Sequence, residues 1–310
     1  MTLRLGLGLP QMAQYDPRHD VPDVARAAEQ TGFDSVWVFE RTVFPQRPLD
    51  GLFGVRDAPW PDHYHACADP LVTLSFAAAV TERVRLGSSV LVSGLHAPFP
   101  LARTLATLDA ASGGRLLAGL GTGWSRDEYR AAGVTAFARR GDQLDELLDV
   151  CAAVWGADPV AYRGAYTEIA PASVGPKPAR PVPVYLAATG GRALERVARR
   201  ADGWLPAHLT GEQLTPLLGT LRSAVERHGR DPKAVDVSLR VGVELTGAPL
   251  PRAGRRPYSG SHDQVVEDLA GAAEAGAREV LLDLQVHCRD GKELADRAAE
   301  LHAGVRAAGL

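Results

Sequence analysis

Short runs rich in β-branched and other apolar residues alternate along this chain with longer stretches in which apolar residues recur at helical spacing. This alternation is typical of parallel α/β architecture, because each strand must return to the same end of the sheet through a crossover helix. Eight strand–helix units predict a closed (β/α)8 barrel in preference to an open sheet. The predicted strands cover residues 3–9, 35–39, 84–92, 115–120, 182–187, 203–205, 235–244 and 279–284.

The length leaves room for insertions within one barrel. The chain has 310 residues, whereas a (β/α)8 barrel needs about 250, so we expect a single domain over residues 1–310. Two proline-rich stretches, 42–68 after the second strand and 156–183 before the fifth, exceed the ~12 to 15 residues of an ordinary loop. We expect both to be insertions that build the substrate mouth. A third irregular stretch, 247–260, is either a mobile lid or a solvated loop.

The composition narrows the class of protein. Apolar residues make up 45% and charged residues 23% of the chain, as in ordinary globular proteins. The formal net charge is −3 with no basic block, so neither nucleic acid nor a membrane surface is an expected partner. The first residues lack the apolar core of a signal peptide, and no run approaches the ~20 apolar residues of a membrane span, which favours the cytoplasm. The chain contains three lysines, and its other basic residues of this kind are arginines. This bias toward arginine indicates a GC-rich coding sequence and favours an actinobacterial source.

The segment Ala188-Thr189-Gly190-Gly191 leads from the predicted strand 182–187 into an amphipathic helix. In a barrel, functional residues gather at the C-terminal ends of the strands. The free N–H groups of a helix start, two glycines that allow close approach and the Thr189 hydroxyl predict a cradle for a phosphate group. A plain strand-to-helix turn is the alternative.

A second glycine cluster, Gly119-Leu120-Gly121-Thr122-Gly123, follows the predicted strand 115–120. We interpret it as a segment that lies against a flat ring or a phosphate. It does not match the dinucleotide-binding pattern G-x-G-x-x-G, because Arg126 stands at the third glycine position and the cluster follows the fourth strand rather than the first.

Several other chemistries are disfavoured. His63 and His65 form an H-x-H pair, but they lie in a proline-rich insertion, so we expect no metal there and interpret them as substrate-facing or surface residues. No lysine lies at the predicted C-terminal end of a strand, which disfavours Schiff-base chemistry, and the G-x-S-x-G nucleophile motif is absent. Cysteines are far apart, and Cys151 is expected to fill the core. The chemistry that remains is one supplied by a phosphate-bearing cofactor.

Nine motifs occur in order at 5–10 (LGLGLP), 32–38 (GFDSVWV), 81–90 (TERVRLGSSV), 112–116 (SGGRL), 119–124 (GLGTGW), 176–178 (PKP), 187–191 (AATGG), 201–204 (ADGW) and 258–261 (YSGS). With these motifs the chain resembles the bacterial luciferase-like flavin monooxygenase superfamily. It is especially similar to the deazaflavin-dependent oxidoreductases of that superfamily, and the likeness spans nearly the whole chain.

The resemblance implies a (β/α)8 barrel that binds reduced FMN or coenzyme F420, an 8-hydroxy-5-deazaflavin. In the family a non-proline cis peptide after the third strand places a bulge against the cofactor ring, and the matching bond here joins Ser89 and Val90. The phosphate loop of the family matches Thr189, Gly190 and Gly191, next to Ala188. Ring-edge and ribityl contacts match Gly121, Thr122 and Gly123.

The chain also departs from the family pattern. Deazaflavin sugar and alcohol dehydrogenases place a histidine where Arg41 follows Glu40, and they can carry a carboxylate where Trp124 stands. The expected proton-transfer pair is therefore missing. Hydride transfer to an activated alkene, imine or nitro compound does not require that pair, and Arg41 could stabilise developing negative charge. The alternative is an ion pair of Arg41 with Glu40 or an aspartate that only braces the loop.

The leading hypothesis is an F420-dependent oxidoreductase that passes hydride between the deazaflavin C5 and a small organic substrate. The alternatives are a monooxygenase that uses reduced FMN and oxygen with a separate reductase, a metal-dependent barrel hydrolase, and a non-catalytic cofactor-binding protein. Pairing of two copies through the first barrel helices is a further expectation. The candidate catalytic residues are Glu40, Arg41, His63 and His65, and the candidate substrate mouth consists of Phe44, Trp60, Trp124 and His208.

Overall fold

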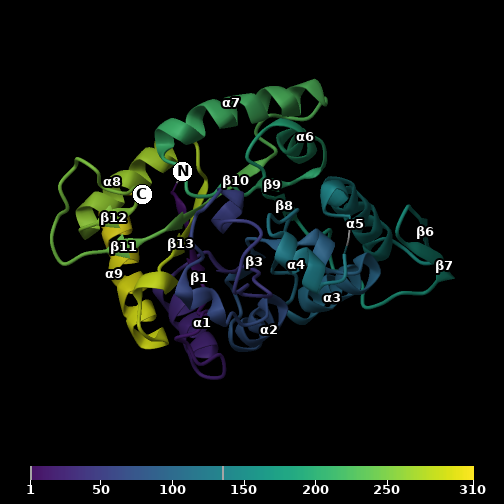
Figure 1. The fold of residues 1–310 in the computed structure, drawn as a ribbon, viewed down its shortest axis with the longest axis horizontal. Coiled ribbons are helices and arrows are strands. Elements are labelled where there is room, and N and C mark those ends of the chain that lie inside the picture. The colour runs from purple at the N-terminus through teal and green to yellow at the C-terminus, as the bar shows by residue number, and fades with distance from the viewer. Residues whose placement is uncertain (1, 135) are drawn as a thin grey trace.

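Eight parallel strands close into a barrel in the computed structural model, which describes residues 2–134 and 136–310 (Figure 1). The first strand pairs with both the second and the last, and the third pairs with the fourth barrel strand, so the sheet has no free edge. The barrel strands are β1 (Arg4–Gly8), β2 (Ser35–Val38), β3 (Arg85–Ser88), β5 (Leu116–Gly121), β8 (Val184–Leu186), β9 (Gly203–Trp204), β10 (Asp236–Gly242) and β13 (Glu279–Asp283). All eight predicted strands, and with them the predicted (β/α)8 barrel, are confirmed.

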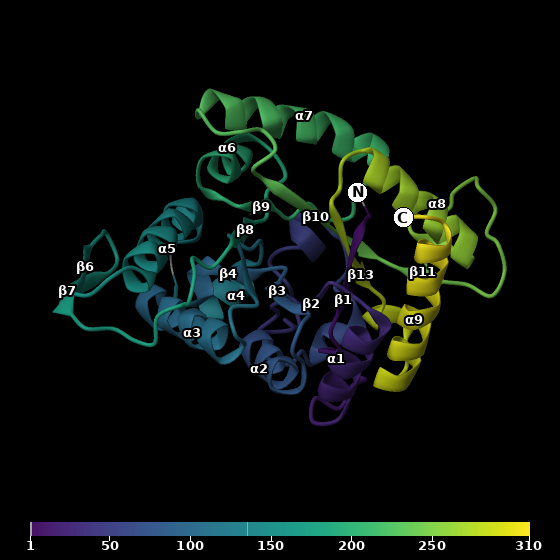
Figure 2. The ribbon, with the colours of Figure 1, turned by 180° about the vertical axis from the view of Figure 1, so that it is seen from behind.

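Helices surround the strands on all sides, and the views from front and back show the same ring (Figure 2). Within the described part of the chain, no helix is long and apolar enough to cross a membrane. One short helix, α4 (Arg126–Ala131), stands between β5 and the longer helix that follows it. The other helices are α1 (Asp20–Thr31), α2 (Pro70–Val80), α3 (Pro98–Ala111), α5 (Arg140–Trp155), α6 (Gly191–Arg200), α7 (Gly211–Arg227), α8 (His262–Glu274) and α9 (Gly291–Ala307).

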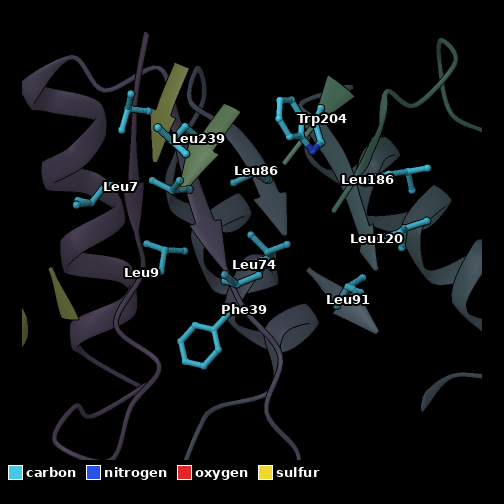
Figure 3. Close-up of a cluster of buried hydrophobic side chains, with 14 of the residues drawn as sticks. Leu7, Leu9, Phe39, Leu74, Leu86, Leu91, Leu120, Leu186, Trp204 and Leu239 are labelled. Atoms are coloured by element: carbon cyan, nitrogen blue, oxygen red, sulfur yellow. The ribbon is translucent and has the colours of Figure 1, made fainter. Parts of the chain in front are cut away.

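The core lies in two layers because side chains alternate across each strand. The larger layer fills the space between barrel and helices, and Leu7, Leu86, Leu120 and Leu239 in Figure 3 belong to it. Cys151 of α5 also lies in this layer, as predicted. A smaller layer fills the barrel itself and consists of Trp37, Leu117, Tyr185, Leu205 and Leu281. The barrel is therefore a packed scaffold rather than a channel, and only its rim remains for a site.

The third predicted strand, 84–92, is interrupted in the structure. It consists of β3 and the two-residue β4 (Leu91–Val92), and the peptide bond between Ser89 and Val90 at the interruption is cis. The resemblance implies a cis bond at this position. Both strands still pair with β5, so the interruption displaces the chain locally without opening the barrel.

The two proline-rich insertions lie in different places, and one of them corrects the sequence analysis. Residues 42–68 follow β2 and lie at the C-terminal end of the barrel. Residues 156–183 instead form an antiparallel hairpin of β6 (Val160–Arg163) and β7 (Glu168–Ala172), which projects beyond α5 in both views (Figures 1 and 2). The expectation that this second insertion builds the substrate mouth is wrong, because a segment between a helix and the next strand begins at the opposite end of the barrel.

The third irregular stretch, 247–260, is tied down at its end. Short strands β11 (Glu244–Leu245) and β12 (Ser259–Gly260) pair in parallel across it. Arg255 donates two hydrogen bonds of 2.7 Å to Asp268 on α8, and the backbone N–H of Tyr258 donates to the same carboxylate at 2.7 Å. The C-terminal part of the loop is thus fixed on the outer helices.

Candidate active site at the mouth of the barrel

Glycines of β5 and its continuation lie against the segment that follows β3. A Cβ atom on Gly119 would stand 1.6 Å from the carbonyl oxygen of Ser88, and one on Gly121 would stand 2.6 Å from Cγ2 of Val90. Gly123, two residues further, faces the same segment and has a φ of +63°. Residues two apart in a strand share a face, so the G-x-G-x-G spacing is explained by the close approach of the interrupted strand.

Arg240 of β10 supports the interrupted strand from inside the barrel. Its Nη1 donates a hydrogen bond of 2.8 Å to the carbonyl oxygen of Ser89, and its Nη2 donates one of 2.5 Å to Oδ2 of Asp283. The guanidinium carbon lies 5.1 Å from the ring centroid of Phe39. Burial disfavours the charge, but the carboxylate of Asp283 more than compensates and raises the pKa of Arg240. A buried ion pair therefore fixes the carbonyl of Ser89, which precedes the cis bond.

The predicted phosphate cradle forms the start of α6. The carbonyl of Ala188 accepts a hydrogen bond of 2.9 Å from the Trp204 indole, which anchors the loop, and Thr189 is exposed. Gly190 and Gly191 have φ angles of +156° and +51°, and nothing lies within 4 Å of where their Cβ atoms would be. No side chain of the described residues caps this helix start. The arrangement leaves free N–H donors beside open space.

The four predicted mouth residues belong to one chain of aromatic contacts. Ring centroids of Phe44 and Trp60 are 6.1 Å apart, and those of Trp60 and Trp124 are 4.8 Å apart. Phe53, which the sequence analysis did not single out, lies 6.0 Å from Trp124 and 5.3 Å from His208. The first insertion thus reaches across the barrel end, from the strand β2 side to the residues after β9.

Arg41 is held by a partner that the sequence analysis did not consider. Its Nη1 lies 2.6 Å from Oε2 of Glu128 on α4, and the two side chains are 10% and 1% exposed. The backbone N–H of Thr42 donates to the other carboxylate oxygen at 2.9 Å, while the guanidinium carbon lies 4.7 Å from the Trp124 ring centroid. The alternative that Arg41 forms an ion pair with Glu40 or an aspartate names the wrong partner, because α4 brings a buried glutamate into reach.

Glu40 points away from Arg41 and is fully engaged. Its Oε2 accepts a hydrogen bond of 2.6 Å from the backbone N–H of Val92, and its Oε1 lies 2.8 Å from Nε2 of His96. The carboxylate is buried. Burial alone would lower the pKa of His96, but the hydrogen bond and charge of Glu40 more than offset this and raise it. In this arrangement Glu40 fixes the segment after the cis bond.

His63 and His65 diverge in the structure. The ring of His65 stacks on Phe44 at a centroid distance of 3.8 Å, whereas His63 contacts the edge of Tyr64 at 5.1 Å. Across residues 2–134 and 136–310, no three His, Cys, Asp or Glu side chains converge as a metal site. The metal-dependent hydrolase alternative therefore has no supporting geometry in the part of the chain that is described.

Two histidines at the mouth have shifted pKa values. Burial among protein groups lowers the pKa of His63, and it also lowers the pKa of His208, which the positive charge of Arg240 shifts further in the same direction. The ordinary histidine pKa is ~6.5, so a lowered pKa makes the neutral ring the main form of both residues at pH 7. Neutral imidazoles at this place can accept a proton or a hydrogen bond.

A family model described as luciferase-like monooxygenase matches residues 3–246. The chain belongs to the luciferase-like monooxygenase family. An uncharacterised protein of Mycobacterium tuberculosis is 36% identical over 210 residues, which cover 66% of this chain and 74% of that protein. The F420-dependent glucose-6-phosphate dehydrogenase of Kineococcus radiotolerans is 32% identical over 250 residues, which cover 79% of this chain and 69% of that protein.

The fold of this luciferase-like chain is shared by solved structures. One of them, an F420-dependent secondary alcohol dehydrogenase in complex with an F420–acetone adduct, has a TM-score of 0.77 at 19% identity and covers 99% of this chain and 100% of its own. At that identity the likeness shows the fold alone. The family and the named relatives confirm the resemblance drawn from the motifs and the expectation that the chain is an oxidoreductase.

Four residues of the luciferase-like site were missed by sequence reasoning. Glu128, His96 and Arg240 lie neither directly after a barrel strand nor in a recognisable motif, and each enters the site through a contact distant in sequence. Of these three residues, only Arg240 could have been noticed in the sequence, because it is a charged residue within a predicted barrel strand. Phe53 was also missed, although an aromatic residue in a proline-rich insertion beside Trp60 was a usable clue.

Proposed function

We propose that this chain is an F420-dependent oxidoreductase that passes hydride between the deazaflavin and a small organic substrate. The observation that carries the proposal is the open, uncapped glycine start of α6 at the barrel rim, next to the interrupted strand. The F420 dependence of the dehydrogenase from Kineococcus radiotolerans supports F420 over other phosphate-bearing cofactors. Membership in the luciferase-like monooxygenase family supports the alternative, a monooxygenase that uses reduced FMN and oxygen.

The residues present fit the phosphate of such a cofactor. The backbone N–H groups of Gly191 and Arg192 have no acceptor among the described residues, and the helix start carries a partial positive charge. The hydroxyl of Thr189 is exposed beside them. Ala188 to Gly191 would hold the phosphate, and Gly121 to Gly123 with Ser89 and Val90 would flank the ring.

The bound deazaflavin would supply the hydride, and the residues of the mouth would orient the substrate. Arg41 has five N–H donors, and within the described residues only Nη1 has a hydrogen-bond partner. The remaining donors can bind a substrate oxygen on which negative charge develops. Glu128 holds the guanidinium in one orientation, and Trp124 stacks beside it.

The same geometry favours substrates that need little proton transfer. Arg41 stands where the related sugar and alcohol dehydrogenases carry a histidine, and Glu40 is bound to Val92 and His96. We therefore propose an activated alkene, imine or nitro compound as the substrate class, with His63 or His208 as a hydrogen-bond acceptor at the mouth. Glucose 6-phosphate is not expected to be turned over.

Binding and turnover test the proposal. Purified protein is titrated separately with F420 and FMN, and oxidation of reduced F420 is then followed with a panel of activated alkenes, imines and nitro compounds. We expect F420 binding and substrate-dependent oxidation without consumption of oxygen. Micromolar FMN binding without F420 binding, together with oxygen-dependent product formation, would instead establish the monooxygenase, which needs a separate flavin reductase.

We also propose that two copies of the chain pair through α2. Val72 and Phe76, four residues apart on one face of this helix, are 56% and 42% exposed, so two large apolar side chains lie together at the surface. Sedimentation of the wild-type protein and of Phe76→Glu tests the pairing, since a charge in an apolar interface should yield monomers. Separately, we propose that the protein is cytoplasmic.

A further inference from the structure

Within the described part of the chain, the guanidinium of Arg41 forms a hydrogen bond through only one of its nitrogens. Nη1 donates a hydrogen bond of 2.6 Å to Oε2 of Glu128, and neither Nε nor Nη2 has an acceptor among those residues. Neither atom is buried, in contrast to the unpartnered Nε of Arg240, so both donors reach open space at the barrel mouth. Nε and Nη2 lie on one edge of the planar guanidinium, and this edge is free to bind a ligand.

The direction of this free edge is fixed by the groups around Arg41. Glu128 is 1% exposed, and its second carboxylate oxygen accepts a hydrogen bond of 2.9 Å from the backbone N–H of Thr42. The rings of Trp124 and Trp60 lie 4.7 and 5.9 Å from the guanidinium carbon. A pair of donors that is already held in place loses little conformational entropy when a ligand binds.

Helix α4, which carries Glu128, is itself anchored to the first insertion. The backbone N–H and Nε of Arg126 donate hydrogen bonds of 2.8 and 3.0 Å to the carboxylate of Asp50. The backbone carbonyl of Asp50 accepts a hydrogen bond of 2.9 Å from the indole of Trp60. One hydrogen-bonded unit therefore carries both the anion that orients Arg41 and one aromatic wall of the mouth.

The free edge of Arg41 matches a planar group with two oxygens. The N–H bonds of Nε and Nη2 point in parallel, and such a fork binds both oxygens of a carboxylate in one plane. A nitro group has the same planar arrangement of two oxygens. An imine, a ketone or an aldehyde offers only one acceptor atom, so it leaves half of the fork unused.

The chemistry of hydride addition decides between a nitro group and a carboxylate. Hydride that adds to an alkene conjugated with a nitro group places one negative charge on the nitro oxygens. The same addition beside a carboxylate places a second negative charge on a group that already carries one. A cationic fork stabilises the single charge as it develops in the transition state. A carboxylate is therefore expected to bind to Arg41 without activating its alkene for reduction.

We propose that the substrate is a nitroalkene whose two nitro oxygens are bound by Nε and Nη2 of Arg41, an inference that rests on the proposed function and narrows its substrate class. The hydride from the deazaflavin C5 forms a C–H bond at the β-carbon, and the electron pair of the C=C bond passes to the nitro group. Water then protonates the α-carbon, which yields a nitroalkane. Both electrons come from the reduced deazaflavin, whose remaining ring proton is released to water.

A binding experiment tests the recognition of two oxygens without turnover. The protein with oxidised F420 is titrated in a calorimeter with hydrocinnamate, which carries a carboxylate, and with hydrocinnamamide, in which one oxygen is replaced by a donor. We expect hydrocinnamate to bind about tenfold more tightly, as charge-assisted hydrogen bonds allow. Arg41→Lys keeps the charge and removes the fork, so it should abolish most of this preference.

Turnover tests the substrate class with two alkenes that share a phenyl ring. β-Nitrostyrene carries a nitro group and benzalacetone carries a ketone, and the ratio of their kcat/KM values is measured in each protein. The intrinsic reactivity of the two compounds is the same throughout, so it cancels when ratios are compared. Arg41→Lys should lower the ratio about tenfold. The control Arg47→Lys, at an exposed arginine of the same insertion, should leave it unchanged.

A second variant keeps the test valid if Arg41→Lys is unstable. Arg41→Gln combined with Glu128→Gln removes the fork and both charges but allows a hydrogen bond between the two neutral side chains. It should lower the ratio of kcat/KM values at least as far as Arg41→Lys. Melting temperatures are recorded for each variant, so that a loss of folding is separated from a loss of selectivity.

The outcomes distinguish this inference from the proposed function. An unchanged ratio in both Arg41 variants would overturn the assignment of the fork, and so would reduction of cinnamate as fast as β-nitrostyrene. Reduction of benzalacetone but not of β-nitrostyrene would overturn the nitroalkene while leaving F420 dependence in place. Failure of F420 to bind, or of reduced F420 to be oxidised by any activated compound, would reject the proposed function itself.

Discussion

Nη1 of Arg41 lies 2.6 Å from Oε2 of Glu128, and this ion pair joins the end of β2 to helix α4 at the barrel mouth. Burial raises the pKa of Glu128, although the positive charge of Arg41 and the N–H of Thr42 oppose the shift. Burying this ion pair therefore costs desolvation free energy. The pair lies where it orients the guanidinium of Arg41 toward the proposed substrate.

Removal of the glutamate charge should destabilise the protein. In Glu128→Gln the Arg41 side chain, 10% exposed, loses its anionic partner, and we expect the free energy of unfolding to fall by about 3 kcal/mol in urea titrations. The matched control is Glu168→Gln, because Glu168 pairs with Arg163 with both side chains largely exposed, and its loss should cost less than about 1 kcal/mol. Equal losses in the two variants would contradict the role of the buried pair.

The stability contributed by Glu40 and His96 should depend on pH. The raised pKa of His96 means that this contribution is complete below the ordinary histidine value of ~6.5 and is lost as rising pH deprotonates the ring. The difference in unfolding free energy between wild type and His96→Gln should therefore shrink as pH rises from about 5.5 to about 8.5. His19→Gln breaks an exposed pair with Asp16 and should show little such change. A pH-independent difference at His96 would argue against the charged pair.

A methyl group at Gly121 should disturb the floor of the site. Its Cβ would meet Cγ2 of Val90 at 2.6 Å, so Gly121→Ala must displace the segment after the cis bond, at a cost of about 1–3 kcal/mol and with weaker cofactor binding. Gly219→Ala, in helix α7 with nothing within 4 Å of the new Cβ, should instead raise stability by up to about 1 kcal/mol. Thermal unfolding and cofactor titration check both, and an unchanged Gly121→Ala protein would reject the close approach.

Phe53 should affect substrate binding without affecting stability. Its side chain is 51% exposed and contacts Trp124 and His208, so Phe53→Ala should leave the melting temperature unchanged and raise KM about two- to tenfold. Tyr166→Ala removes a ring that is 44% exposed at the β6–β7 hairpin, away from the mouth, and should leave KM unchanged. A fall in melting temperature with constant KM would place Phe53 in the scaffold instead.

Much of the fold could be read from local pattern. The eight barrel strands were predicted because buried strands such as 115–120 and 279–284 are short apolar runs bounded by turn residues. The hairpin of β6 and β7 was missed because its residues are mostly exposed and carry no such pattern. Helix α4 was not predicted because its 6 residues are too few to show a helical pattern. Glu128 lies on this helix and was therefore not identified as a site residue.

Residues of the site could be predicted only where they are neighbours in one short segment of the sequence. The start of α6 was identified from Ala188 to Gly191 because glycines and a hydroxyl lie together in the sequence. The partners of Arg41 and Glu40 were not identified, because Glu128 lies 87 residues and His96 56 residues further along the chain.

The sequence by itself determined the barrel and its closed order, since alternation of strand and helix patterns is a property of neighbouring residues. It also determined which end of the barrel would carry chemistry. Tertiary structure decided which charges are free to act there. An arginine in the sequence is a cation whose partners are set by packing, so only the fold could show that Arg41 is bound to Glu128 and that Glu40 is bound to Val92 and His96 instead.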